Sequence, residues 1–263
     1  MKFDWEFFWT SLLQPSPTFL NGLTVTIVVS VVAMVLALVL GLAIALMGRS
    51  RFMVVRFIAG IYIWVIRGTP LLVQLVIIYM GLATAGIFRF EDQEVFGVLV
   101  RAAIQAAIVG LTIHESAYIS EVIRAGLEAV DTGQHEASGA LGMTPGAAMR
   151  WIILPQALRT MVPPLGNIFN GLMKATSILS IIGVAEVFLV AQAISSATFR
   201  TFEIFIVAAL YYLALTTIWT FIQAWIERKL NAQVGIVDQM SFVQRLTRAK
   251  QPRVTTLQGT LNA

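Results

Sequence analysis

The sequence predicts an all-α integral membrane protein with five transmembrane helices. Of the 263 residues, 58% are apolar and only 12% are charged, and the mean hydropathy is +0.82. Soluble domains carry about 25% charged residues, and a single soluble core could not bury this much apolar surface. Two further observations support the same class: five apolar stretches have the length of a bilayer crossing, and basic residues gather in alternate loops.

The five expected spans follow from the roughly 20 apolar residues that a crossing requires. They lie at about residues 20–47, 57–85, 98–122, 162–191 and 204–226. Residues 1–19 then form a short extracytoplasmic N-terminus, residues 20–230 the transmembrane domain, and residues 231–263 a polar cytoplasmic tail. Inside the second span, Arg67-Gly68-Thr69-Pro70 interrupts the helix, because Pro70 lacks a backbone donor. This break is either a hinge or cavity wall, with Arg67 and Gln74 nearby, or a packed kink.

The positions of lysine and arginine predict which loops face the cytoplasm. If the N-terminus is outside, inner segments hold twelve such residues and outer segments hold four. The twelve are Arg49, Arg51, Arg56, Arg124, Arg150, Arg159, Arg228, Lys229, Arg245, Arg248, Lys250 and Arg253. The four are Lys2, Arg89, Arg101 and Arg200. With an odd number of spans, this asymmetry predicts that the N-terminus is outside and the C-terminus inside.

Composition and motifs argue against several function classes. The chain has no cysteine and only two histidines, so we expect no metal site. No G-x-x-x-x-G-K-[ST] loop is present, so this chain should not hydrolyse ATP itself. No basic stripe is interleaved with aromatics, which argues against nucleic-acid binding. A membrane enzyme has little support, because no nucleophile lies near a base.

The loop at residues 124–160 predicts two short helices joined at a glycine corner. Asp131, with Gln134 three residues on, is typical of a helix start, and Gly142 suits a left-handed helix end. Thr144-Pro145 then predicts an N-cap with proline in the first turn, and Pro155 should close or kink the second helix. From these residues alone, the helical hairpin either docks into a partner protein or lies on the membrane surface.

Within this loop, Glu136-Ala137-Ser138, Gly142 and Ile152-Ile153-Leu154-Pro155 resemble the EAA loop of binding-protein-dependent ABC importer permeases. The family pattern is E-A-A, three residues, G, nine residues and I-x-L-P. The spacing matches throughout, and Ser138 replaces the second alanine. The resemblance implies that the loop couples to an ATPase through Glu136, Ala137, Ser138, Gly142, Leu154 and Pro155.

Further stretches resemble the polar amino acid subfamily, which includes histidine, glutamine and arginine permeases. They are residues 21–26, 66–74, 116–121, 154–157, 163–167 and 182–186, and the resemblance covers about residues 20–230. It implies a type I ABC importer permease of the bacterial cytoplasmic (inner) membrane that carries no cofactor. Such a subunit would pair with a second, identical or different permease and bind ATPase subunits that hold the ATP. It would receive a polar amino acid from an extracytoplasmic solute-binding protein.

Polar residues at bilayer depth are candidates for the substrate path, because each charge there costs about 2.5–3.5 kcal/mol on insertion scales. The candidates are Asn167, Asn170, Lys174, Ser177, Glu115, Arg67 and Gln74. The first four share one helix face, which either lines the path or meets the partner permease, unless Lys174 extends to the lipid headgroups. Lys174 or Arg67 would bind the carboxylate of an amino acid, and the two asparagines or Glu115 its ammonium group.

Other intramembrane polar residues have structural alternatives. Glu115 and His114 can belong to a buried hydrogen-bonded network, and Glu121 can pair with Arg124 at the inner surface. Glu186 either joins an outer gate or caps a helix. A secondary amino acid transporter or a channel subunit would also need polar membrane residues, but it gives no reason for the spaced Gly142 and Leu154-Pro155.

Overall fold

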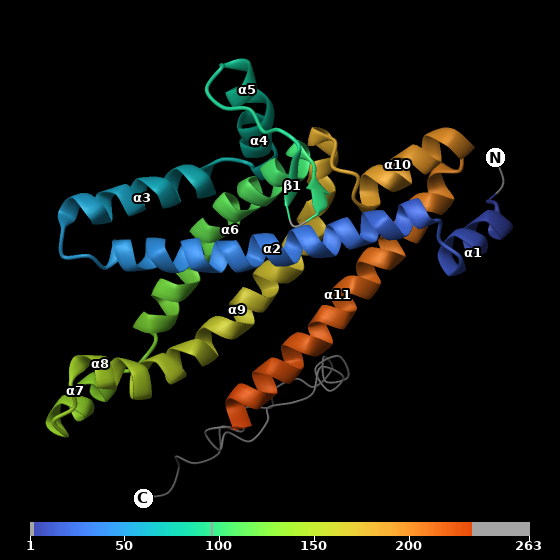
Figure 1. The fold of residues 1–263 in the computed structure, drawn as a ribbon. Coiled ribbons are helices and arrows are strands. Elements are labelled where there is room, and N and C mark those ends of the chain that lie inside the picture. Colours follow the sequence, from blue (N-terminus) through green and yellow to red (C-terminus); the bar gives the residue numbers. More distant parts are fainter. Residues whose placement is uncertain (1–2, 96, 233–263) are drawn as a thin grey trace, which may run out of the picture.

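The computed structural model describes residues 3–95 and 97–232, which form a fan of long helices and one small hairpin (Figure 1). The first half contains α1 (Trp5–Leu13), α2 (Pro17–Gly48), α3 (Met53–Gly68), α4 (Leu71–Val76), α5 (Leu82–Thr84), β1 (Gln93–Val95) and β2 (Val98–Val100). The second half contains α6 (Ala102–Glu128), α7 (Thr132–Ala140), α8 (Pro145–Ala148), α9 (Leu154–Ala175), α10 (Val187–Thr198) and α11 (Thr201–Ala232). Two π-helical turns, Ile77–Gly81 and Met149–Ile153, and a 3-10 segment, Thr176–Ile182, join neighbouring helices.

Four helices in the described part of the chain are long and apolar enough to cross a bilayer. They are Pro17–Gly48, Ala102–Glu128, Pro145–Ile182 and Thr201–Asn231. A fifth crossing arises if Met53–Gly68 and Leu71–Thr84, which are bent by 106° at the break between them, count as one span. The expected number of five therefore depends on this bent pair.

The fourth expected span, 162–191, has the wrong boundaries. The helix begins much earlier, at Pro145, and ends at Ile182, where Gly183 takes a left-handed conformation with φ 81°. The residues after Gly183 start a separate helix, α10, with Glu186 as its N-cap. The apolar run continues across this corner, so hydropathy alone could not reveal it.

Two local elements were also missed. Residues 98–100, expected to start the third span, pair as β2 with β1 in an antiparallel hairpin that matches Glu94 with Leu99, so the fold is not purely helical. The expected N-terminal segment 1–19 contains α1, whose cap Asp4 accepts a hydrogen bond from the Phe7 amide at 3.0 Å. Apart from its first two residues, the expected tail at 231–263 lies outside the described residues.

The centre of the fold is a seam of small residues between α2 and α6. Ala33, Ala37 and Gly41 follow one face of α2 at intervals of four, and both alanines are fully buried. A Cβ on Gly41 would lie only 2.7 Å from the Ile119 side chain of α6. Small residues at this spacing let membrane helices approach closely and gain van der Waals contact.

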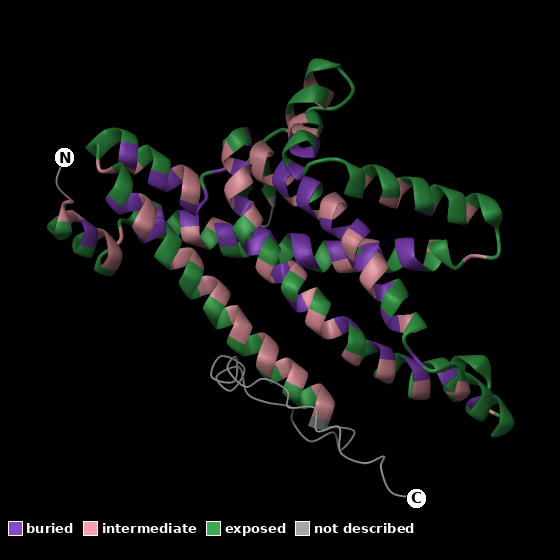
Figure 2. Ribbon diagram, turned by 180° about the vertical axis from the view of Figure 1, so that it is seen from behind, coloured by how far each residue is buried: buried purple, intermediate pink, exposed green. Residues whose placement is uncertain are grey.

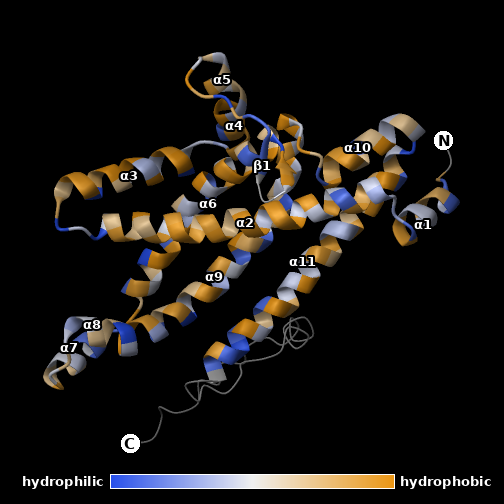
Figure 3. Ribbon diagram, viewed as in Figure 1, coloured by the Kyte–Doolittle hydropathy of each residue, from blue (hydrophilic) through white to orange (hydrophobic). Residues whose placement is uncertain are grey.

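Large apolar side chains of α3 point outward, as expected for contact with lipid or with another membrane subunit. Ala59 is the only residue of α3 that is buried, whereas Trp64 is 76% and Val54 70% exposed. Figure 2 shows this helix exposed along most of its length, and Figure 3 shows that its surface is largely hydrophobic. A soluble protein rarely exposes so large an apolar surface.

The break between α3 and α4 is closed by the side chain of Gln74. Its Nε2 donates to the carbonyls of Ile66 at 2.8 Å and Thr69 at 3.1 Å, and also to the Thr69 hydroxyl. Its Oε1 accepts from His114 Nδ1 at 3.0 Å. Carbonyls freed by a broken membrane helix must find donors inside the protein. Gln74 is 7% exposed and provides them, which supports the packed kink.

Replacing Gln74 with leucine should therefore destabilise the chain, because the carbonyls at the break lose their donor. A lost partner for a buried polar group costs about 1–3 kcal/mol. We expect the free energy of unfolding, measured by SDS titration of the purified chain in mixed micelles, to fall by about that amount. The control is Gln192→Leu on exposed Gln192 of α10, which should change little. Equal stability of the two variants would contradict this role of Gln74.

Candidate functional site

The loop after α6 forms an elbow, here defined as α7, α8 and the corner between them. Asp131 caps α7 by accepting from the Gly133 amide at 2.7 Å. At the corner Gly142 has φ 71°, and the amide of Met143 donates to the carbonyl of Ser138 at 3.0 Å. A second bond joins the Gly142 amide to the Gly139 carbonyl. This pair of bonds is a Schellman helix end, as expected for a glycine at that position.

The second helix of the elbow also starts as predicted. The Thr144 hydroxyl accepts from the Ala147 amide at 3.3 Å, and Pro145 occupies the first turn. Pro155, however, neither closes nor visibly interrupts the helix. The chain widens into the π-helical turn Met149–Ile153 just before it, and the Leu154 amide donates to the carbonyl of Met149, five residues back. The wider turn accommodates a residue without an amide proton.

As a result, one helical path runs from the elbow into the fourth span, Pro145–Ile182. The side-chain amide of Gln156, at the start of α9, donates to the Gln134 side chain of α7 at 3.2 Å and ties the elbow to this path. Figure 1 shows the elbow at the end of the molecule far from α1 and α10. The elbow and α9 are thus joined both along the chain and through this pair of side chains.

The six residues of the EAA pattern that were expected to contact the ATPase differ in their exposure. Glu136, Ala137, Gly142, Leu154 and Pro155 are exposed. Ser138, in contrast, is 3% exposed, and its hydroxyl donates to the carbonyl of His135. Ser138 therefore faces its own chain and stabilises the elbow from inside.

Two exposed apolar residues were not among the expected contacts. Leu141 at the corner is 79% exposed, and Trp151 in the π-helical turn is 68% exposed, with the Arg150 guanidinium 5.2 Å from its ring centre. Large apolar side chains at an exposed surface are frequent anchors of protein interfaces. For Leu141 the available signal was its isolation among small residues, whereas Trp151 is followed directly by an apolar run and had no such signal.

The polar face of α9 is uncovered by the rest of the described chain. Asn167 and Lys174 are exposed, Asn170 and Ser177 are half-buried, and the opposite side of the helix is buried. Gly171 lies between Asn170 and Lys174, and a Cβ added to it would meet no atom within 4 Å. The Ser177 hydroxyl donates to the carbonyl of Lys174, so it is engaged within its own helix. This face is open to a cargo molecule or to a second subunit.

Arg67 and Gln74 are not placed with that face. Arg67 lies 3.7 Å from Glu121, and its guanidinium lies 5.3 Å from the centre of the Tyr118 ring. Glu121 also pairs with Arg124 at 3.1 Å, as the sequence predicted. All the polar atoms of the Gln74 amide group serve the helix break or His114. The expected substrate-path set is therefore divided between α9 and the α3–α6 contact.

Glu115 is buried in α6 at 9% exposure. Within the described residues, no hydrogen bond or ion pair to its carboxyl group is found, in contrast to Glu186. The latter accepts from the Phe188 and Leu189 amides and from the Tyr212 hydroxyl at 2.6 Å, so it caps α10. The carboxyl oxygens of Glu115 are nevertheless not sealed inside the protein, because the Thr112 hydroxyl is the only fully buried side-chain polar atom without a partner in the described part of the chain. A carboxyl group that is accessible and has no partner keeps Glu115 among the candidates.

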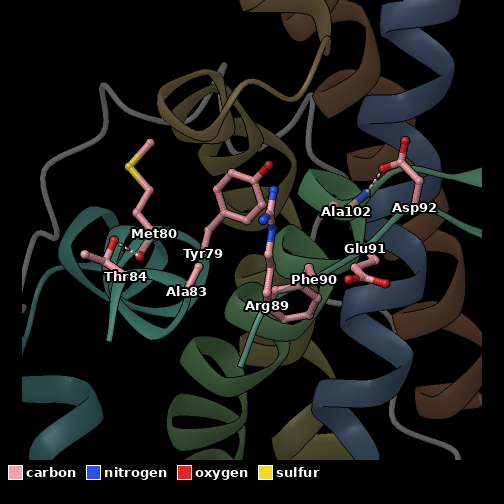
Figure 4. A pocket seen from close by; sticks show the side chains of 9 residues that line it. All are labelled: Tyr79, Met80, Ala83, Thr84, Arg89, Phe90, Glu91, Asp92 and Ala102. Atoms are coloured by element: carbon pink, nitrogen blue, oxygen red, sulfur yellow. Dashed lines mark hydrogen bonds between the residues drawn. The ribbon is translucent and has the colours of Figure 1, made fainter. Parts of the chain in front are cut away.

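At the other end of α6, a hollow of about 850 Å³ opens between α5 and the segment that leads into the hairpin. Figure 4 shows Arg89 extended beside the ring of Tyr79, with Glu91 and Asp92 across from them. Asp92 accepts from the Ala102 amide at 2.8 Å and so starts α6. The hollow and the elbow lie at opposite ends of α6, and sequence reasoning did not find the hollow because its lining comes from three separate segments.

Comparison with known proteins identifies the family that shares this architecture. Residues 37–232 match the family model described as "Binding-protein-dependent transport system inner membrane component". The probable amino-acid ABC transporter permease protein PatM of Vibrio harveyi is 38% identical over 88% of this chain and 98% of its own length. The arginine transport system permease protein ArtQ of Bacillus subtilis is 38% identical over 82% of this chain and 94% of its own.

A solved structure agrees with these relatives. A chain in the crystal structure of an amino acid ABC transporter with histidines superposes with a TM-score of 0.76 at 39% identity, covering 87% of this chain and all of that one. Family membership sets aside the secondary transporter and the channel. The chain belongs to the family of binding-protein-dependent transport system inner membrane components, the non-catalytic permease subunits of ABC transporters.

Proposed function

We propose that this permease imports a polar amino acid or a close derivative across the bacterial cytoplasmic membrane. It works with a second permease subunit, with ATPase subunits bound at the elbow and with a solute-binding protein at the opposite end. The observation that carries the proposal is the continuous helix Pro145–Ile182, which joins the elbow to the polar face of α9. The amino acid cargo is inferred from relatives such as PatM and ArtQ.

The exposed side of the elbow is suited to bind a separate ATPase subunit. It offers the small residue Ala137 for close approach, Glu136 for a polar contact and Leu141 as an apolar anchor. Because the Schellman corner and the Gln156–Gln134 bond fix the elbow to α9, a push on α7 tilts the fourth span. Packed helices have discrete arrangements, so ATP binding in the ATPase can shift the permease between inward-open and outward-open states.

The orientation of the chain in the membrane follows from the ATPase-binding role of the elbow. In this proposal the elbow faces the cytoplasm, where ATP is available, and Arg150 and Arg159 follow it along the chain. This agrees with the excess of basic residues on that side. The hollow beside Arg89 and Glu91 then faces outward, where a solute-binding protein delivers cargo.

The uncovered face of α9 has the chemistry that an amino acid zwitterion needs. Lys174 offers a cation for the carboxylate, and the side-chain carbonyls of Asn167 and Asn170 offer acceptors for the ammonium group. The competing role for this face is contact with the second permease. Both roles need an uncovered face, and a binding measurement separates them.

Gly142→Ala should weaken attachment of the ATPase. A Cβ at this position meets nothing within 4 Å, so any effect comes from the left-handed backbone, which costs an L-residue about 1–2 kcal/mol. We expect lower co-purification of the ATPase and faster amide exchange in α7. Gly142→Asn should restore both, because asparagine tolerates this conformation.

The matched control for that substitution is Gly146→Ala. Gly146 also has open space around its Cβ position, but it lies within α8 with ordinary helical geometry. ATPase attachment should survive this change. If Gly142→Ala attached the ATPase as well as Gly146→Ala, the corner would have no part in coupling.

Lys174→Met and Asn170→Ala should each weaken cargo binding to the purified permease–ATPase complex in the absence of binding protein. A hydrogen bond to a charged group contributes about 1.5–3 kcal/mol, which corresponds to roughly a tenfold or greater rise in Kd. Ser177→Ala is the control, because its hydroxyl is already engaged with the Lys174 carbonyl. Unchanged Kd in the first two variants, together with a weaker permease pair, would assign the face to the subunit interface.

The cargo itself is identified by ATP hydrolysis in the reconstituted complex. Binding protein loaded with successive amino acids is added, and we expect one polar amino acid or a small group of them to stimulate hydrolysis. Stimulation by none of them, with an intact complex, would overturn the proposed cargo while leaving family membership unaffected.

A further inference from the structure

Helix α1 is held alongside the first turns of α11. The Asp4 amide donates to Glu203 Oε1 at 2.8 Å, and the Tyr211 hydroxyl donates to the carbonyl of Leu12 at 2.9 Å. Both bonds join residues 199 apart in sequence, so the two helices run in parallel over about 12 Å. An ion pair of 2.9 Å between Asp4 and Arg200 fixes the beginning of this contact.

The inward side of α1 is part of an apolar cluster. Phe8 is 7% exposed and packs with Ile204, Val207 and Ala208 of α11. This anchoring leaves the opposite side of α1 uncovered by the described chain. The orientation of α1 about its own axis is therefore set by Phe8 and by the bonds at its two ends.

The uncovered side is itself divided into an apolar and a polar strip. Trp5, Trp9 and Leu13 are spaced four apart and are 63%, 49% and 71% exposed. The neighbouring strip consists of Glu6, Thr10 and Gln14, which are also exposed. Residues four apart lie on one helix face, so each strip is continuous. If this side of α1 faced only water, an apolar strip beside the polar one would not be expected.

The position and chemistry of the apolar strip fit the boundary of a bilayer. Tryptophan is enriched at membrane–water interfaces, where its ring meets lipid and its N–H meets polar headgroups. The strip begins beside the charged groups Asp4 and Arg200 and ends at Leu13, four residues before the charge-free helix α2. Phe202, which is 68% exposed, packs edge-on against Phe3 and extends the apolar surface onto α11, a membrane span.

We propose that α1 lies in the headgroup region of the bilayer, with the Trp5–Trp9–Leu13 strip against lipid and the Glu6–Thr10–Gln14 strip toward water. It thereby anchors the beginning of α11 at a fixed depth. This assignment requires that α11 spans the membrane, and it does not depend on the cargo or on the coupling role of the elbow.

The chain has no cysteine, so single cysteines can be introduced directly. Leu13→Cys and its matched neighbour Gln14→Cys retain both tryptophans, and each is labelled with a nitroxide in the full chain reconstituted into phospholipid nanodiscs. Collision with oxygen, which concentrates in lipid, is compared with collision with a water-soluble nickel chelate. We expect the oxygen-to-nickel accessibility ratio to be shifted upward at position 13 relative to position 14.

A second pair, Trp9→Cys and Thr10→Cys, tests whether the same division holds one turn earlier. Correct folding of every variant is checked by its thermal melting. Equal nickel accessibility at positions 13 and 14 would place the strip in water and overturn the proposal. Shielding of position 13 from both reagents, or only after a solute-binding protein is added, would also overturn it by assigning the strip to a protein partner.

Discussion

A bilayer cannot hydrogen-bond to the backbone, and this constraint shapes the breaks between the membrane helices. At the break before α4, Gln74 supplies donors to the freed carbonyls. At the corner after Gly183, Glu186 accepts the first amides of α10 and is itself bound by Tyr212. A polar side chain thus satisfies backbone groups at each of these two breaks, so the chain can change direction there without leaving those groups unpaired.

In the proposed coupling role, the elbow, the π-helical turn before Pro155 and α9 act as one continuous element, with the Schellman corner at the end that binds the ATPase and Lys174 farther along it. α9 packs against α6, which is itself held close to α2 at Gly41. In this proposal, a movement of the elbow changes access to the polar face of α9.

Structural features that depend on neighbouring residues were predictable from the sequence, whereas features that depend on residues far apart in the chain were not. The corner at Gly142 and the cap at Thr144 follow from local backbone chemistry, and both are confirmed. The end of the fourth span was misplaced because apolar residues continue past Gly183. The EAA pattern included Ser138, whose inward orientation depends on packing within the elbow. One of the hydrogen bonds of Gln74 joins it to His114, forty residues away, and no spacing rule reveals that contact.

We propose that this chain moves cargo by coupling to a separate ATPase. This is tested most directly by uptake of a labelled amino acid into proteoliposomes that contain the complete complex, with loaded binding protein on one side and ATP on the other. We expect accumulation that requires hydrolysable ATP on the elbow side and continues when ion gradients are collapsed. Accumulation driven by an ion gradient without ATP would contradict it.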